Sequence, residues 1–406
     1  MLEKALSSIK VLDLTHYVSG PYATKLLADM GAEVIKVERP RTGDPCRNLG
    51  PFVADNPHPE KGLLFLYLNG NKRGVTLNLK GGDGKEILQA LLRWADLVAV
   101  NFAPSTLEEL GLTYEEITAV NPSAVVLSIT NFGLTGAYRD YKAWDLVEYA
   151  LSGLMYIFGA HDQAPIAHAL HQAQFRAGTL AGGAALIALY GSLNGASVSA
   201  HGSRGNLVDV SVMEVLSASL RDTVSQYTYQ GVVRRRTPRF GRGLGRTVAA
   251  ADGYLIPTMT GAGTDWDIFA EFLGAPELKN EKFATQEDRI RNAEELDQII
   301  TRVFLERTKL DLFHNAHAWR FHFGVVLTPK EVSESEQLHD RGFFVQVDHP
   351  IAGRLTYPGA SALYSETPWE AMIPAPTLGQ HNQEVYGKLL GYSTGDLMTL
   401  RSSGVI

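Results

Sequence analysis

Residues 10–40 constrain the fold of this chain most, because they have the pattern of one compact βαβ unit. An apolar strand, a tight turn at Ser19-Gly20-Pro21, an amphipathic helix, a break at Gly31-Ala32 and a second strand ending at Glu38 follow one another. The first strand of such a unit leads to a helix N-terminus, where unpaired backbone N–H groups favour phosphate. An acidic residue that ends the second strand can bind a ribose. The loop 15–21 lacks the G-x-G-x-x-G spacing, so the pattern predicts a nucleotide-type unit without the usual NAD site.

Length and composition narrow the class of protein. The chain has 406 residues, which predicts about two or three domains of roughly 100 to 200 residues each. It is 45% hydrophobic and 20% charged with a formal charge of −7, which is typical of a globular protein and argues against nucleic acid as a partner. Cys46 is the single cysteine, so neither a disulfide framework nor a C-x-x-C metal site is expected.

The same features predict a cytoplasmic protein. A lone cysteine fits a reducing compartment, and no basic segment followed by an apolar stretch marks a signal peptide at the N-terminus. The longest apolar run, residues 181–193, contains three glycines and is too short to span a bilayer. No membrane partner is therefore expected.

Strand-like and helix-like segments alternate through the first 130 residues, which predicts an α/β fold with a mostly parallel sheet covered by helices. Two buried helices are expected over 144–158 and 175–193, and a change to polar and aromatic residues then indicates a linker. We predict a large domain over 1–216, a linker over 217–245, a smaller α+β domain over 246–326, and a return to the large domain over 327–406. The expected elements of the first part are 74–79, 97–101 and 124–130 as strands, and 84–94 and 107–119 as helices.

The residues that could carry chemistry point to phosphate binding more than to a metal or a hydrolase. His161, His168 and His171 lie close together in the sequence, but no H-E-x-x-H pattern supports a zinc site. The G-x-S-x-G elbow and the P-loop are both absent from the sequence. Basic residues instead lie near predicted strand ends and turns, where an open α/β sheet binds phosphorylated cofactors. They are Arg39, Lys72, Arg73 and Arg139.

A series of motifs resembles the class III CoA-transferases, also called the CaiB/BaiF family. The resemblance covers essentially the whole chain and includes relatives such as formyl-CoA transferases and α-methylacyl-CoA racemase. Its N-terminal motifs are Val11-Leu12-Asp13-Leu14-Thr15-His16, Ser19-Gly20-Pro21, residues 27–38, Gly43-Asp44 and residues 71–77. Further matches are Asn101-Phe102, Gly111-Leu112, Asn121-Pro122, residues 132–136, Trp144-Asp145, Ser152-Gly153, Arg341-Gly342, Asp348-His349-Pro350, Ala375-Pro376 and Leu378-Gly379.

The resemblance implies a Rossmann-like large domain built from both ends of the chain, a small domain in the middle and an interlocked-ring dimer. Coenzyme A, as the acyl-CoA substrate, would lie across the large domain, and no metal is implied. Carried over by position, its neighbours would be His16, Arg39, Lys72, Arg73, Asn101 and Arg139. Ala103 departs from the family pattern, which usually has an arginine after Asn-Phe, so one phosphate contact would be missing or supplied elsewhere.

The catalytic aspartate of the family forms an acyl-aspartyl anhydride and then carries CoA as a thioester. It lies four residues before a helix glycine, which is Gly178 here, and Gln174 occupies its position. An amide cannot form the anhydride, so the resemblance implies that no catalytic residue stands in this slot. The favoured interpretation is the non-catalytic subunit of a heteromeric CoA-transferase, with a homologous subunit supplying the aspartate, as in succinyl-CoA:benzylsuccinate CoA-transferase of anaerobic aromatic degradation.

Three alternatives remain open. In a homodimeric transferase a displaced nucleophile, Asp145 or Asp162, would replace the aspartate. A racemase-like enzyme would need an acid at Gln174 and a histidine at Trp144. An NAD oxidoreductase ranks last because the glycine fingerprint is absent.

The segment 241–245 is either a glycine-rich lid over the active site or an ordinary linker.

Overall fold

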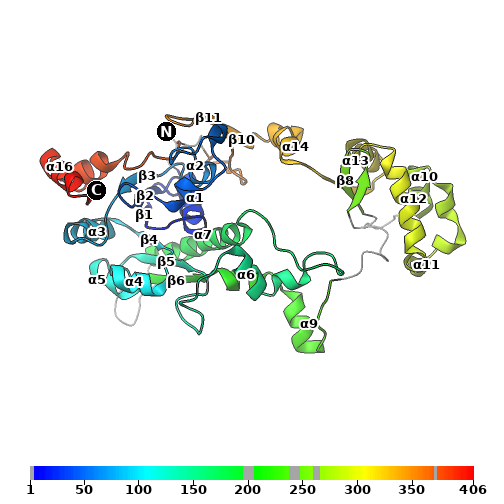
Figure 1. Ribbon diagram of the computed structural model, residues 1–406, viewed down its shortest axis with the longest axis horizontal. Coiled ribbons are helices and arrows are strands. Elements are labelled where there is room, and N and C mark those ends of the chain that lie inside the picture. The colour runs from blue at the N-terminus through cyan, green and yellow to red at the C-terminus, as the bar shows by residue number, and fades with distance from the viewer. Residues whose placement is uncertain (1–3, 195–204, 237–246, 259–265, 370–372) are drawn as a thin grey trace. The chain divides into compact units, whose positions relative to one another are not determined.

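The computed structural model describes residues 4–194, 205–236, 247–258, 266–369 and 373–406. The chain forms two compact units, which are described here separately. The first contains Met1–Ile157, Ile166–Arg234 and Arg341–Ile406, and the second contains Phe158–Pro165 and Arg235–Asp340. The N-terminal blue and C-terminal red segments lie together in the first unit (Figure 1). This unit is therefore built from both ends of the chain.

A six-stranded sheet forms the centre of the first unit, and all its neighbouring strands are parallel. The order β3-β2-β1-β4-β5-β6 places β1 between β2 and β4, and Leu12 pairs with both Ile35 and Val98. The predicted α/β class with a parallel sheet is confirmed. The strands are β1 (Lys10–Asp13), β2 (Glu33–Glu38), β3 (Arg73–Thr76), β4 (Leu97–Val100), β5 (Val125–Thr130) and β6 (Asn206–Ser211).

One hydrophobic core joins the sheet to α3 (Gly82–Trp94), α4 (Pro104–Leu110) and α5 (Tyr114–Val120), and it includes the C-terminal Val405 and Ile406. The helix expected over 107–119 is in fact two helices. Gly111 ends α4 in the left-handed conformation with φ of 69°, and a capping box formed by Thr113 and Glu116 starts α5.

A second set of helices contains α1 (Ser19–Asp29), α2 (Leu63–Leu68), α6 (Asp145–Leu151), α7 (Gln172–Leu193), α8 (Val212–Ala218) and α9 (Asp222–Gln230). Helix α7 packs closely on α1, because Gly178 lacks a side chain: a Cβ there would lie 2.6 Å from the carbonyl oxygen of Ser19. The helix expected over 144–158 ends earlier, at Leu151, and a 3-10 turn at Leu154–Ile157 follows Gly153, whose φ is 78°.

The C-terminal part of the first unit contains an antiparallel hairpin of β10 (Phe344–His349) and β11 (Gly353–Pro358), a π-helix (Gln383–Leu389) and α16 (Thr394–Ser402). It is tied to the N-terminal part by hydrogen bonds. The Tyr386 hydroxyl donates to the Thr76 carbonyl over 2.9 Å, and the Asn78 backbone N–H donates to the Val405 carbonyl over 2.8 Å. The C-terminus therefore lies beside the end of β3.

The second unit has an antiparallel sheet, β7 (Val248–Ala250), β8 (Gly253–Thr258) and β9 (His322–Val326), packed on an aromatic core that includes Phe269 and Phe304. Its helices are α10 (Trp266–Leu273), α11 (Gln286–Arg291), α12 (Ala293–Leu305), α13 (Lys309–Ala318), α14 (Pro329–Ser333) and α15 (Glu336–Asp340). The segment 241–245 lies outside the described residues. Among the described helices, none combines the length and apolar character needed to cross a membrane.

Candidate active site

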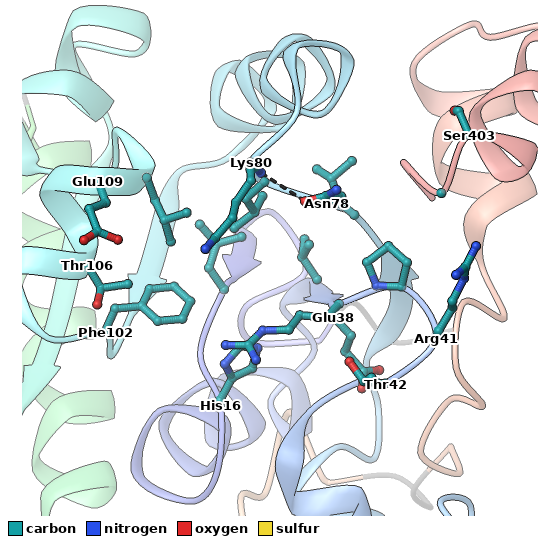
Figure 2. A pocket seen from close by; sticks show the side chains of 18 residues that line it. His16, Glu38, Arg41, Thr42, Asn78, Lys80, Phe102, Thr106, Glu109 and Ser403 are labelled. Atoms are coloured by element: carbon teal, nitrogen blue, oxygen red, sulfur yellow. Dashed lines mark hydrogen bonds between the residues drawn. The ribbon is translucent and has the colours of Figure 1, made fainter.

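A pocket of about 670 Å³ lies where the parallel strands end. Segments that follow β1, β2, β3 and β4 line it, together with two residues after α16 (Figure 2). The carboxyl ends of parallel strands are where open α/β sheets bind ligands. Its lining includes Leu14, His16, Glu38, Arg39, Arg41, Thr42, Asn78, Lys80, Phe102, Thr106, Glu109, Ser403 and Gly404.

His16 is held in this pocket by the loop that follows β4. Its backbone N–H donates to Asn101 Oδ1 over 2.9 Å, and Asn101 Nδ2 donates back to the His16 carbonyl over 2.7 Å. Phe102 meets the imidazole edge-on, with ring centroids 5.3 Å apart. Burial lowers the pKa of His16 to about 4, so the ring is neutral at pH 7. Asn101 itself does not line the pocket.

Three cationic side chains line the pocket: Arg39 and Arg41 after β2, and Lys80 after β3. Arg39 and Lys80 are exposed, and the Lys80 side chain lies in the same hollow as His16 and Phe102 (Figure 2). Cations at strand ends are suited to phosphate groups. Of the six residues expected beside CoA, His16 and Arg39 line this pocket, and Asn101 holds His16 in place.

The other three expected residues are engaged elsewhere. Lys72 is buried, and its ammonium lies within 3.0 Å of oxygens on Asp13, Pro21, Thr24 and Asn69. It therefore fixes the start of α1 to the end of β1 and does not line the pocket. Arg73 pairs with Glu33 and Glu384, and Arg139 pairs with Glu108, so neither guanidinium lines the pocket.

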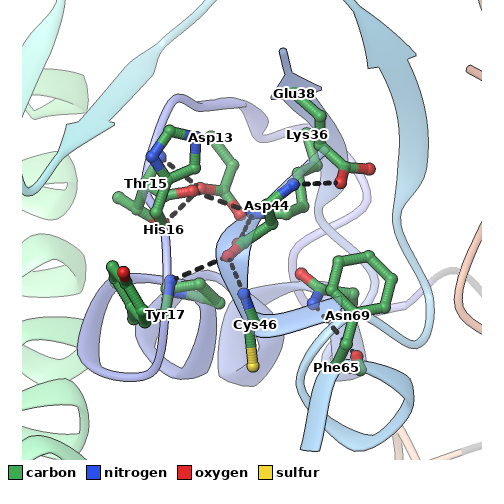
Figure 3. A network of polar contacts seen from close by, with 12 residues as sticks. Asp13, Thr15, His16, Tyr17, Lys36, Glu38, Asp44, Cys46, Phe65 and Asn69 are labelled. Atoms are coloured by element: carbon green, nitrogen blue, oxygen red, sulfur yellow. Dashed lines mark hydrogen bonds and ion pairs between the residues drawn. The ribbon is translucent and has the colours of Figure 1, made fainter. Parts of the chain in front are cut away.

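A buried network supports the loop that carries His16. Lys36 pairs with Asp44 at 3.0 Å, and Asp44 accepts hydrogen bonds from the backbone N–H groups of Tyr17 and Cys46 (Figure 3). The positive charges of Lys72 and Lys36 hold the pKa of Asp13 well below its usual range, despite the opposing effect of burial. Glu38 binds the guanidinium of buried Arg47, so its carboxylate is engaged within the protein. This network fixes the backbone between β1 and α1.

A second cluster lies where α6 meets the start of α7. The Gln174 amide donates to both carboxylate oxygens of Glu148, over 3.3 Å and 3.0 Å. Asp145, one turn earlier on α6, accepts a hydrogen bond of 3.1 Å from the Ala173 backbone N–H and so caps α7. Glu148 is fully buried, and its burial, together with the charge of Asp145, raises its pKa to about 7. We refer to Asp145, Glu148 and Gln174 as the α6–α7 cluster.

The other residues that the sequence offered as metal ligands or nucleophiles make local contacts. Asp162 lies in the second unit beside His161, His168 contacts the Tyr149 hydroxyl, and His171 lies near Asp145. Within the described ranges, no group of three or more His, Cys, Asp or Glu residues is arranged to hold a metal ion.

Sequence reasoning missed Lys80, Arg41 and Glu148. Lys80 and Arg41 follow strands closely, which is a signal that could have identified them. Glu148 stands three residues after Asp145 on a short helix, so the two side chains lie on one face of α6. The residue that this face contacts, Gln174, belongs to a different helix farther along the chain. The approach of Glu148 to Gln174 is thus a tertiary contact.

Comparison with known proteins gives a consistent result. The model of CoA-transferase family III matches residues 6–382. Formyl-CoA:oxalate CoA-transferase of Streptomyces avermitilis is 33% identical over 100% of both chains. Succinyl-CoA:glutarate CoA-transferase of Mus musculus is 31% identical, covering 99% of this chain and 90% of the relative. A CAIB/BAIF family protein from Brucella suis matches the structure with a TM-score of 0.83 and 25% identity, covering 95% of this chain and 99% of that protein.

Proposed function

Because the chain belongs to CoA-transferase family III, we propose that it moves CoA from an acyl-CoA donor to a carboxylic acid acceptor. The pocket at the strand ends supports CoA as the bound substrate. It offers three cations for phosphates, the Phe102 ring and the neutral His16. This meeting of cations and an aromatic ring at the carboxyl edge of the sheet carries the proposal.

For the acceptor we propose a short dicarboxylic acid. The relatives are named for glutarate and oxalate, and a further relative from Chloroflexus aurantiacus, 31% identical, is named for D-citramalate. All three acids carry two carboxylates. Benzylsuccinate, expected from the heteromeric resemblance, shares this property, but none of these three relatives is named for it. Succinyl-CoA and glutarate are therefore the first assay pair.

The carboxylate that carries CoA has two candidate sources, because Gln174 occupies the position of the family aspartate. In the two-subunit assembly expected from the sequence, a homologous partner in an interlocked dimer supplies an aspartate. In the second assembly no different subunit is needed, because a carboxylate of this chain carries CoA. The buried Glu148 beside Gln174 favours the second assembly.

The function is tested with the purified chain alone. We expect it to bind CoA and to form glutaryl-CoA from succinyl-CoA and glutarate, followed by liquid chromatography and mass spectrometry. Absence of CoA binding by calorimetry would contradict the proposed function. Binding without transfer, with activity appearing only after co-purification of a second subunit, would instead identify the heteromeric assembly.

Lys80→Ala should weaken CoA binding about five- to thirtyfold, because one charge-assisted contact to phosphate is lost. The Kd is measured by titration calorimetry at low and high salt, and the difference between variant and parent should shrink as salt rises. Lys85→Ala is the matched control, since Lys85 is exposed on α3 and does not line the pocket. Equal losses from both variants would show that the pocket is not the CoA site.

A further inference from the structure

The α6–α7 cluster places a carboxylate next to the side chain that replaces the family aspartate. Glu148 Oε2 lies 3.0 Å from Gln174 Nε2, so the acid is one hydrogen bond away from the functional group of residue 174. The side chain comes from α6, whereas Gln174 belongs to α7. A carboxylate is therefore present at this position of the fold although residue 174 does not provide it.

Asp145 and Glu148 differ in what binds them. Asp145 caps α7 through the Ala173 N–H and lies near His171, which gives it a structural task. Glu148 accepts hydrogen bonds from the Gln174 amide, and in the described part of the chain no lysine or arginine forms an ion pair with it. Of the two carboxylates, that of Glu148 is therefore the one that holds no backbone group in place.

Burial of an acid without a cation costs stability, and sites that carry such a cost often serve function. Glu148 is fully buried while Gln174, which contacts both its oxygens, is partly exposed. Gln174 is thus the solvent-accessible partner of this hydrogen-bonded pair, and rotation of exposed side chains occurs in picoseconds to nanoseconds. The end of α7 that carries Gln174 also lies near α1, since Gly178, one turn later, abuts Ser19.

We infer that Glu148 supplies the carboxylate that accepts the acyl group in this chain, and that Gln174 covers and orients it. This inference rests on the proposed CoA transfer. One Glu148 oxygen attacks the thioester carbonyl, the C–S bond breaks, and a mixed anhydride and the CoA thiolate form. The thiolate then attacks the glutamyl carbonyl and releases the donor acid, leaving a glutamyl-CoA thioester. The acceptor carboxylate attacks that thioester, the C–S bond breaks, and a second mixed anhydride and the CoA thiolate form. The thiolate then attacks the acceptor's acyl carbonyl and breaks its C–O bond to the glutamyl group, which gives the CoA ester of the acceptor and restores the Glu148 carboxylate.

The test is Glu148→Gln in the full chain, with capture of the intermediate. We expect a loss of at least about a thousandfold in kcat with succinyl-CoA and glutarate, while the Kd for CoA stays within about twofold. Hydroxylamine added to the parent protein with succinyl-CoA should convert the glutamyl thioester to a hydroxamate on Glu148, seen by peptide mass spectrometry. Glu148→Asp should keep a measurable fraction of the activity, because it retains a carboxylate.

Glu115→Gln is the matched control, since Glu115 is an exposed glutamate on α5. Transfer by the parent with the hydroxamate on another residue, or full activity of Glu148→Gln, would overturn the role of Glu148 and leave the proposed function intact. A chain that binds CoA but transfers nothing without a second subunit also overturns it. Failure to bind CoA at all would reject the proposed function itself.

Discussion

Glu148→Gln should make the protein more stable at pH 8, by about 3 kcal/mol in the free energy of unfolding. Burial raises the pKa of Glu148 from 4.5 to about 7 in the folded chain. Between pH 4.5 and about pH 7, Glu148 is ionised in the unfolded chain but still protonated in the folded chain. The free energy of unfolding of the parent protein therefore falls as pH rises through this range. Glutamine removes this loss and still offers an oxygen to the Gln174 amide. Urea unfolding of parent and variant at pH 4 and pH 8 measures the effect.

The gain should be confined to high pH, since Glu148 is protonated in both folded and unfolded chains below about pH 4. Asp145 contributes to the effect because its negative charge adds to the rise in the pKa of Glu148. Glu115→Gln, on the surface of α5, should change stability little at either pH. If Glu148→Gln were no more stable than the parent at pH 8, ionisation of Glu148 in the folded chain would not lower the free energy of unfolding.

Lys72→Met should destabilise the protein by about 3–5 kcal/mol, because it leaves the buried Asp13 carboxylate without one of its cations. The Lys72 ammonium lies 3.0 Å from Asp13 and also binds the Pro21 carbonyl, so the start of α1 would lose its anchor. The loss is measured as the fall in free energy of unfolding in urea. Lys80→Met, at an exposed position, should cost less than about 0.5 kcal/mol.

A second variant separates the buried charge from packing. Adding Asp13→Asn to Lys72→Met should restore part of the lost stability, because the unpaired negative charge disappears. If the double variant were no more stable than Lys72→Met, the cost would come from lost packing. If Lys72→Met raised the Kd for CoA a hundredfold without changing stability, the sequence-based expectation of a direct CoA contact would be correct.

Much of the fold could be predicted because local patterns determine it. The apolar strands of the βαβ unit and their spacing indicate a parallel sheet, and the structure has one. Helix boundaries were less predictable where a single residue decides them. Gly111 divides the helix expected over 107–119, because its positive φ ends α4 and Thr113 starts a new cap. The apolar spacing on either side does not reveal such a break.

The candidate site was predictable only where its residues follow strands. Arg39 comes directly after β2 and His16 lies in the loop that follows β1, and the geometry of parallel strands brings them to one edge. Lys72 has the same charge and also stands beside a strand, but its side chain is buried against Asp13. Which way a side chain points depends on the surrounding packing. For the same reason the contact between Glu148 and Gln174 could not be read from the sequence.

The most direct test of CoA transfer through Glu148 is to follow the carboxylate oxygens of the acceptor acid. In the proposed cycle the acceptor acid leaves one of its oxygens on the carrying carboxylate. In a single turnover with succinyl-CoA and heavy-oxygen-labelled glutarate, the purified chain should acquire one heavy oxygen on the peptide that contains Glu148, as read by tandem mass spectrometry. Transfer of CoA with no label at Glu148, or with label on another carboxylate, would contradict this account.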